Sequence, residues 1–303
     1  MTTSLPEPLA AWCETILGGY DAPGECSHPH GESRVWRLFS RTSGETCYLK
    51  AHRRDGKRER EIWAYNHVVA LLGGFAPRLV AVRDEPPPAL LLSALPGEPM
   101  ERVALTPARE RNAWQQAGTA LARYHTVTSP WFGRPDRNGE PLEGTQPDAE
   151  AFWQSRLADW IDRAERGNFL TPDEIAFARD RAGDMNVFRG EPAVATHHDY
   201  TPRNWIVSPD TSEWLGVIDF EHACFDVCVA DFKLYRDRFF ADRPDLEEAF
   251  FTGYGAPLTD RQQAQLRIIH LHQGVSGVVW SREHHDAGFD ATNHAILDRL
   301  RRE

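Results

Sequence analysis

Acidic and amide side chains occur at the spacing of phosphoryl-transfer chemistry in one segment of the sequence. Asp199 is followed five positions later by Asn204, and Asp219 comes directly after an apolar run that ends at Ile218. A carboxylate can accept or orient a hydroxyl proton, and amide and carboxylate oxygens are ligands that Mg²⁺ prefers. The segment therefore predicts a base, Asp199, and two metal ligands, Asn204 and Asp219. Arg203 lies where it could reach a transferring phosphoryl group, although a structural ion pair is an equal alternative.

A β-hairpin is predicted between the amide and the second carboxylate. Fifteen positions separate Asn204 from Asp219. This length fits a short strand over 205–207, a turn at 208–210 and a returning strand over 214–218. Such a hairpin would bring the three polar side chains to one end of the two strands.

The front of the chain supplies a lysine and a carboxylate in the order that a nucleotide phosphate site requires. Lys50 lies near the end of a β-prone run over 46–51. Glu61 is preferred to Glu59 as its partner, because only Glu61 shares a helical stripe with the apolar positions of 65–72. An exposed edge-strand lysine and a helix-surface glutamate are the alternatives when each is considered alone.

The order of expected elements indicates an α+β protein with two lobes. An amphipathic helix is expected over 5–17, with Leu5, Leu9, Trp12 and Ile16 as its apolar stripe, followed by a loop. The remaining front elements are strands at 33–40, 45–51, 78–83 and 89–94 and a helix at 55–72. Behind a linker at 95–98, helices are expected at 106–126, at 171–188 and from 231 onward, with a surface loop at 133–146. We therefore predict a nucleotide-binding lobe at 1–95 and a helical lobe at 96–303.

Composition excludes several classes of protein. The formal charge of −11 argues against a nucleic-acid binder and is compatible with a cationic substrate. No apolar run approaches the roughly 20 residues of a membrane-spanning helix, so no membrane partner and a cytoplasmic location are expected. The five cysteines form no CxxC pair, and the histidines lack zinc-hydrolase spacing, so neither a disulfide framework nor a zinc site is predicted.

The two polar motifs resemble those of the aminoglycoside phosphotransferase and choline kinase family, relatives of the protein kinases. The resemblance implies a two-lobed protein-kinase-like fold, ATP or GTP and Mg²⁺ as cofactors, and transfer to a hydroxyl of a small molecule. An antibiotic of aminoglycoside, nucleoside or peptide type is the first expectation for that acceptor. Alternatives are a metabolite kinase for choline, sugars, nucleosides or amino acids, and a catalytically silent nucleotide-binding protein. The chain is expected to be a monomer or a homodimer.

The same resemblance assigns supporting roles near the motifs. His197 takes the position of a histidine that braces the loop, and Glu221 is the acidic end of the metal motif. Asp226 and Asp231 match a downstream acidic pair. His198 stands where the family commonly has glycine, so a left-handed backbone cannot be assumed there.

Nucleotide and acceptor contacts are expected at further positions. By position, the loop that covers the nucleotide lies at 26–34, with Ser33 as a phosphate contact, and the adenine lies by the linker at Ser93, Ala94 and Leu95. In this family the helical lobe forms the acceptor pocket, where acidic groups suit amines and aromatic groups stack on rings. The candidates are Trp153, Asp159, Trp160, Trp280, Glu283 and Asp286. A core aromatic or a surface charge is the alternative for each.

Overall fold

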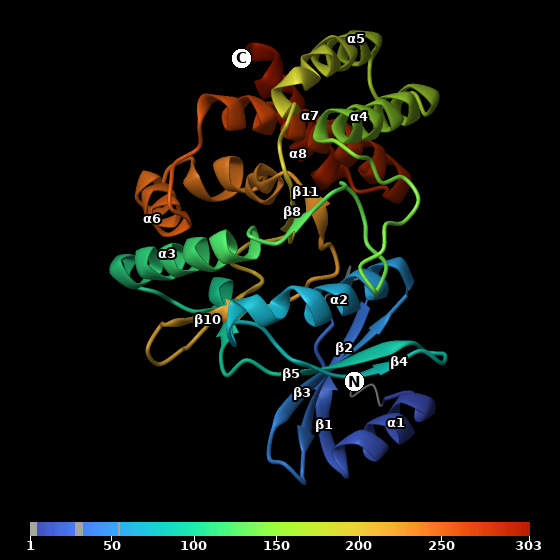
Figure 1. The fold of residues 1–303 in the computed structure, drawn as a ribbon, viewed down its shortest axis with the longest axis vertical. Coiled ribbons are helices and arrows are strands. Elements are labelled where there is room, and N and C mark those ends of the chain that lie inside the picture. The colour runs from blue at the N-terminus through green and yellow to red at the C-terminus, as the bar shows by residue number, and fades with distance from the viewer. Residues whose placement is uncertain (1–4, 28–32, 54) are drawn as a thin grey trace.

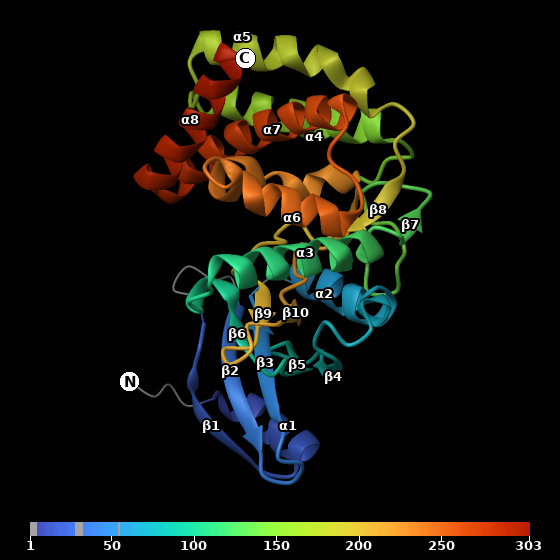
Figure 2. The ribbon, with the colours of Figure 1, turned by 90° about the vertical axis from the view of Figure 1, so that its left-hand side faces the viewer.

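The N-terminal third of the chain forms a β-rich part and the remainder forms a helical part beside it. The computed structural model describes residues 5–27, 33–53 and 55–303. Figures 1 and 2 show the large sheet at one end of the molecule and the long helices at the other. The α+β class and the two-lobed layout are thus confirmed, while the division at residue 95 stays a prediction.

The large sheet has five antiparallel strands in the order β1-β2-β3-β5-β4. Their bounds are β1 Tyr20–Glu25, β2 Ser33–Ser40, β3 Thr46–His52, β4 Leu79–Arg83 and β5 Ala89–Ser93. The hairpin of β2 and β3 and the pair β4 and β5 were predicted. Strand β1 was not, because its Pro and Gly are typical of a loop. An edge strand tolerates them, and the pairing of β1 with β2 shifts register between Asp21 and Gly24.

Helices cover both faces of this sheet. Helix α1, Glu7–Leu17, buries Leu9, Cys13 and Leu17, whereas Ile16 is 42% exposed. Of the predicted stripe, Leu9 is buried and Leu5 and Trp12 pack against the same core cluster, so the prediction was wrong at Ile16 only. Helix α2, Asp55–His67, continues into a 3₁₀ turn, Val69–Leu72, which ends at a left-handed Gly73 as predicted.

The helical part contains α3 Pro107–Tyr124, α4 Ala149–Arg166, α5 Pro172–Arg181, α6 Pro244–Tyr254, α7 Asp260–His284 and α8 Ala287–Arg302. Helix α5 begins at the capping box predicted from Thr171 and Glu174. It ends earlier than expected, because Ala182–Phe188 tightens into a 3₁₀ helix with a non-helical Asp184. Among the described residues, no helix is long and apolar enough to cross a bilayer.

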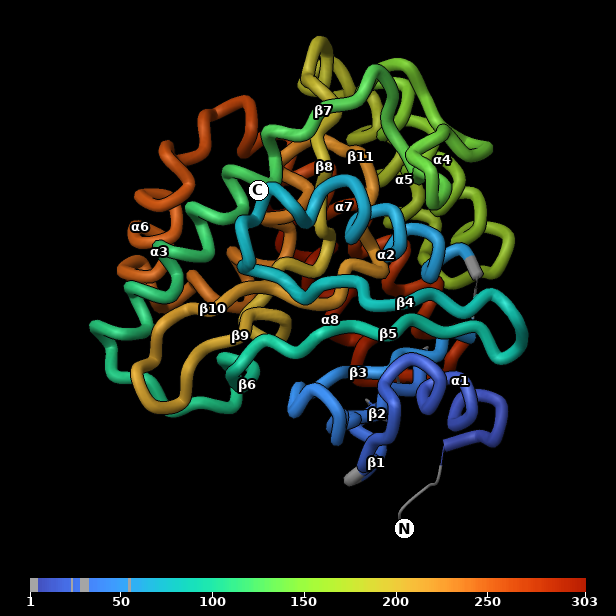
Figure 3. The backbone as a smooth tube through the Cα atoms, turned by 60° about the horizontal axis from the view of Figure 1, so that its bottom comes forward, coloured from blue at the N-terminus to red at the C-terminus, as the bar shows by residue number. Residues whose placement is uncertain are grey.

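Two small sheets lie between the large sheet and the helices. One has the order β10-β9-β6 and the other β11-β8-β7. Figure 3 shows β6, Glu98–Pro99, beside β9, Trp205–Val207, and β10, Trp214–Val217. The other sheet comprises β7 Thr128–Ser129, β8 Ala193–Thr196 and β11 Cys224–Asp226. The predicted hairpin of β9 and β10 is confirmed, and the polar motifs follow β8 and β10.

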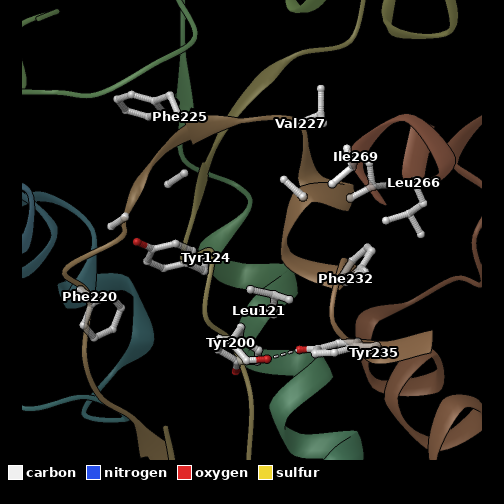
Figure 4. Packing of buried hydrophobic residues seen from close by; sticks show 14 of the residues in the cluster. Leu121, Tyr124, Tyr200, Phe220, Phe225, Val227, Phe232, Tyr235, Leu266 and Ile269 are labelled. Carbon is white, nitrogen blue, oxygen red and sulfur yellow. Dashed lines mark hydrogen bonds between the residues drawn. The ribbon is translucent and has the colours of Figure 1, made fainter. Parts of the chain in front are cut away.

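A buried aromatic cluster supports the loop that follows β8 (Figure 4). The Tyr235 hydroxyl donates to the Tyr200 carbonyl at 2.5 Å, and the Tyr200 hydroxyl donates to the Ala117 carbonyl of α3 at 2.9 Å. Phe232 packs edge-to-face on Phe250. These contacts fix the loop to α3 and to the segment before α6.

The crossing of α3 and α6 depends on two glycines. A Cβ atom at Gly253 would lie 1.9 Å from the Gln115 carbonyl oxygen, and one at Gly118 would lie 2.1 Å from that of Phe250.

We expect Gly253→Ala to destabilise the protein by about 1–3 kcal/mol despite the better helix propensity of alanine, because the helix backbones must separate. Urea unfolding followed by circular dichroism measures this change. Gly183→Ala, where a Cβ would meet no described atom within 4 Å, is the control. Equal stabilities of the two variants would contradict the packing argument.

Candidate active site

A buried carboxylate holds the loop between β8 and β9. Asp231 is 3% exposed and accepts the backbone N–H groups of His197, at 2.9 Å, and His198, at 2.5 Å. Its second contact is His125 Nε2 at 3.0 Å. Burial acts to raise the pKa of Asp231, but the hydrogen bond from His125 and the nearby histidines outweigh it and lower the pKa to about 2. His198 has φ 63°, so it adopts the left-handed backbone that could not be assumed without glycine.

His197 joins this loop to the segment after β10. The Asp199 N–H donates to His197 Nδ1 at 3.3 Å, and His197 Nε2 lies 3.1 Å from the Ile218 carbonyl. A carbonyl can only accept, so the imidazole carries its proton on Nε2. The ring is completely buried, and it spans the two segments that carry Asp199 and Asp219.

Asp199 is oriented by its own loop. Asn204 Nδ2 donates at 2.9 Å both to Asp199 Oδ2 and to the Asp199 carbonyl. Arg203 Nη2 donates to the same carboxylate oxygen, which realises the ion pair left open by the sequence. The Asp199 side chain remains 15% exposed. It is therefore both held in place and accessible.

The hairpin of β9 and β10 brings Asp219 to this loop. The Ile218 N–H donates to the Asn204 carbonyl at 2.9 Å, so the two predicted metal ligands stand at the same end of the hairpin. Asp219 has φ 70°, a conformation that is uncommon for residues other than glycine. Such outliers cluster at functional sites, where surrounding contacts compensate their cost.

Lys50, on β3 of the large sheet, contacts three carboxylates, one from α2 and two from the segment after β10. Its Nζ lies 2.5 Å from Asp219 Oδ1, 2.8 Å from Glu61 Oε2 and 2.9 Å from Glu221 Oε2. Burial acts to lower the pKa of Lys50, but the carboxylates outweigh it and raise the pKa well above its ordinary value. Lys50 is 7% exposed and Glu61 is fully buried. Glu61, and not Glu59, is therefore the helix partner of the lysine.

Two members of this network were missed by the sequence analysis. His52 Nε2 lies 2.8 Å from Glu61 Oε2, and Lys57 Nζ lies 2.8 Å from Glu221 Oε1. Both positions follow from periodicity. His52 is two residues after Lys50 on the same side of β3, and Lys57 precedes Glu61 by one helical turn of α2.

A groove of about 710 Å³ lies beside the linker. Its walls include Ser93 and Leu95, together with the turn between β9 and β10 at 208–210. The Ser93 hydroxyl accepts the Arg78 N–H at 2.8 Å. Ser33 Oγ lies 3.4 Å from Glu221 Oε2, at the other end of the site. Positions 28–32 of the predicted nucleotide-covering loop lie outside the described residues.

The predicted acceptor residues do not form one cluster of free groups. Trp153 is buried, where its indole N–H donates to Asp226 Oδ1 at 2.9 Å. Arg163 is 2.6 Å from Glu283 and lies over the Trp160 ring, and Asp286 accepts the Phe289 N–H as the cap of α8. Trp280 stacks on His284 and is 40% exposed, and Asp159 is exposed. Their roles in binding stay predictions.

The fold and site together define a kinase-like small-molecule phosphotransferase. A lysine held by a helix carboxylate faces an acidic segment, and a separate aspartate lies on an adjoining loop. The sequence matches the model of the phosphotransferase enzyme family, APH, over residues 29–267. The chain therefore belongs to this family of small-molecule kinases. Among curated proteins, no sequence matches it.

Solved structures share the fold at low sequence identity. One is a thermostable mutant of aminoglycoside phosphotransferase APH(4)-Ia with AMP-PNP and hygromycin B, at a TM-score of 0.74 and 15% identity over 96% of this chain and 97% of that chain. The gentamicin complex of APH(2")-IIa has a TM-score of 0.69 and 14% identity over 98% of this chain and 97% of that chain. The macrolide 2'-phosphotransferase MphH from Brachybacterium faecium has a TM-score of 0.65 and 15% identity over 96% of this chain and 98% of that chain.

The Asp231 contacts generate a prediction on stability. Because the pKa of Asp231 is lowered from 3.8 to about 2, its ionised form stabilises the fold above pH 4, and this contribution is lost as the pH falls toward 2. We expect Asp231→Asn to cost about 3 kcal/mol at neutral pH and the difference from wild type to shrink by about 2 kcal/mol toward pH 2. Urea unfolding at several pH values measures both quantities. The exposed Asp298→Asn should change stability by less than about 0.5 kcal/mol. A difference that does not depend on pH would contradict the argument.

Proposed function

We propose that the protein is an ATP- and Mg²⁺-dependent O-phosphotransferase that modifies a hydroxyl of a small molecule. The observation that carries this proposal is the contact of Lys50 with both Glu61 and Asp219, on segments joined by His197 to Asp199. A phosphate-binding lysine, a metal-binding carboxylate and a base are the groups that such transfer requires. GTP remains the alternative nucleotide.

The nucleotide would lie between the nucleotide-binding lobe, residues 1–95, and the helical lobe, residues 96–303. The groove beside Ser93 and Leu95 offers room for the base, and Lys50 would contact the phosphates while Glu61 holds its side chain. Asp219 and Asn204 offer oxygen atoms only, apart from the amide nitrogen that Asn204 directs to Asp199, so the set fits a hard cation such as Mg²⁺. When bound, the metal neutralises charge on the phosphates.

Asp199 would orient the acceptor hydroxyl and accept its proton. Asn204 and Arg203 hold one oxygen of the carboxylate, so the base has a fixed direction before the acceptor arrives. Fixed orientation of this kind lowers the entropic cost of the reaction. Arg203 would also stabilise charge on the transferring phosphoryl group.

An antibiotic hydroxyl is the proposed acceptor, in line with gentamicin and hygromycin B, the antibiotics in two of the related structures. A metabolite kinase is the second candidate. A silent nucleotide-binding protein is disfavoured because Asp199, Asn204 and Asp219 are all present. We place the protein in the cytoplasm, as a monomer or a homodimer.

A panel of acceptors tests the proposed function. Aminoglycoside, macrolide, peptide and nucleoside antibiotics and common hydroxylated metabolites are incubated with ATP or GTP and Mg²⁺. Mass spectrometry then detects an added phosphoryl group. Transfer to at least one compound supports the proposal, whereas ATP binding without transfer to any compound supports the silent binder.

The role of Asp199 gives a mutational prediction. We expect Asp199→Asn to retain ATP affinity within about twofold and to lower kcat by about 10²–10⁴, because the amide cannot accept the hydroxyl proton. Steady-state kinetics and ATP titration measure the two effects. Asp180→Asn, an exposed change on α5, is the control. Undiminished transfer in Asp199→Asn would remove Asp199 from this role.

A further inference from the structure

Four cationic side chains lie around β11, near His198 of the loop between β8 and β9. We call this group the cationic cluster; it comprises Arg60, Arg134, Arg156 and Lys233. Each residue comes from a different segment, namely α2, the loop at 133–146, α4 and the segment after Asp231. All four side chains are partly or fully exposed to solvent.

Contacts with β11 bring three of these segments together. Trp63, one turn after Arg60 on α2, packs on Phe225 of β11 with ring centroids 4.9 Å apart. Gly133, the neighbour of Arg134, pairs with Phe225 through two backbone hydrogen bonds. Figure 1 shows this loop descending from the helical part to α2. The arginines at 60 and 134 therefore approach the same strand from two directions.

The other two members reach the same place through Asp226 and His198. Arg156 follows Trp153 by about one turn of α4, and both side chains bind Asp226. Arg156 Nη1 lies 3.4 Å from Asp226 Oδ2. Lys233 Nζ donates to His198 Nδ1 at 3.0 Å, and His198 Nε2 lies 3.2 Å from Asp226 Oδ2. Burial lowers the pKa of Lys233, and the carboxylates of Asp231, Asp199 and Asp226 are near enough to counter this in part. The cluster thus extends to the proposed base.

The cluster has few internal counter-charges. Within the part of the chain that the structure describes, neither Arg60, Arg134 nor Lys233 forms a salt bridge, and Arg60 Nε donates only to the Gly56 carbonyl. Asp226 is the single carboxylate bound to Arg156. Burial raises the pKa of Asp226 to about 6, so the carboxylate is still mostly ionised at neutral pH and offsets one of the four cations.

The imidazole between them adds no acidic partner. Burial and Lys233 hold the pKa of His198 well below its ordinary value, so the ring is neutral. Its Nδ1 accepts from Lys233, so its proton lies on Nε2, which faces Asp226 Oδ2 at 3.2 Å. Arg179 on α5, by contrast, is paired with Glu165 at 2.7 Å. What distinguishes the cluster is that its cations converge on one strand of a chain whose formal charge is −11.

We propose that the cationic cluster binds an oxyanion group, a carboxylate or a phosphate, of the acceptor molecule whose hydroxyl Asp199 orients. Arginine forks suit both groups, and the cluster places them beside the base and away from the groove at the linker. A polycationic acceptor would instead meet repulsion at this surface. The inference rests on the proposed phosphotransferase function; among the candidate acceptors it favours an alcohol that carries a carboxylate or a phosphate over a polycationic antibiotic.

Matched acceptor pairs test the inference. Each pair shares a carbon skeleton and differs in the anionic group: glycerol and glycerate, ribose and ribose 5-phosphate, a nucleoside and its monophosphate. Kanamycin represents polycations. We expect kcat/KM to be at least about tenfold higher for the anionic member of a pair, because a charged hydrogen bond contributes that much. Equal or higher kcat/KM for the neutral members or for kanamycin would overturn the inference.

Variants locate the effect. Arg156→Gln and Lys233→Gln should each raise KM for an anionic acceptor by about tenfold to a hundredfold while KM for ATP stays constant, and Arg156→Lys should retain part of the affinity. Arg179→Gln, exposed on α5, is the matched control. Circular dichroism confirms folding of each variant. Variants that raise KM for the neutral and the anionic member of a pair equally would contradict anion recognition.

A binding measurement separates this inference from the proposed function. Isothermal titration of glycerate and ribose 5-phosphate into protein saturated with AMP-PNP and Mg²⁺ keeps the anions from the phosphate site at Lys50. Binding that Arg156→Gln weakens and Arg179→Gln preserves supports the cluster even if no acceptor is phosphorylated, in which case only the proposed function fails. No binding, or binding that is equal in both variants, overturns the inference.

Discussion

The buried ammonium of Lys50 is the interaction on which the site depends. Burial of an unpaired charge costs several kcal/mol, so the lysine on β3 requires carboxylates from the segments that pack around it. Glu61 comes from α2, and Asp219 and Glu221 come from the segment after β10. With Lys57, the group holds two cations and three carboxylates, and is therefore negative by one charge. The excess lies toward Asp219, whose side chain is 32% exposed, so the network that positions this carboxylate also prepares it to attract a further cation.

The loop between β8 and β9 is held in the opposite way, by a buried carboxylate that accepts from backbone N–H groups. Backbone N–H groups of His197 and His198 converge on the buried Asp231, and this convergence requires the left-handed backbone at His198. The strain at a non-glycine residue costs of order 1 kcal/mol, which charge-assisted hydrogen bonds exceed. His197 then transmits the constraint to Ile218, one residue before Asp219. The two functional segments are therefore fixed to each other by buried polar groups rather than by the hairpin alone.

Local periodicity determined what the sequence could reveal. The choice of Glu61 over Glu59, the hairpin before Asp219 and the cap at Thr171 all follow from spacings within a few residues, and the structure has them. Strand β1 was missed, and Ile16 was wrongly placed on the buried face of α1, because edge position and sheet contacts override local preference. The partners of Trp153 and Glu283 lie tens of residues away in sequence, so no local pattern indicates that Asp226 and Arg163 engage them.

Net charge was the weakest guide to the acceptor. The formal charge of −11 is compatible with a cationic ligand, yet that sum is spread over the whole chain. Exposed charges interact over about 10 Å at 0.1 M salt, so only nearby groups determine the field at a site. Near Lys50 the carboxylates are in excess, whereas around β11 the unpaired groups are Arg60, Arg134 and Lys233. Asp199 stands between these regions of opposite sign, and an anionic alcohol in that field would place its charge toward β11 and its hydroxyl toward the base.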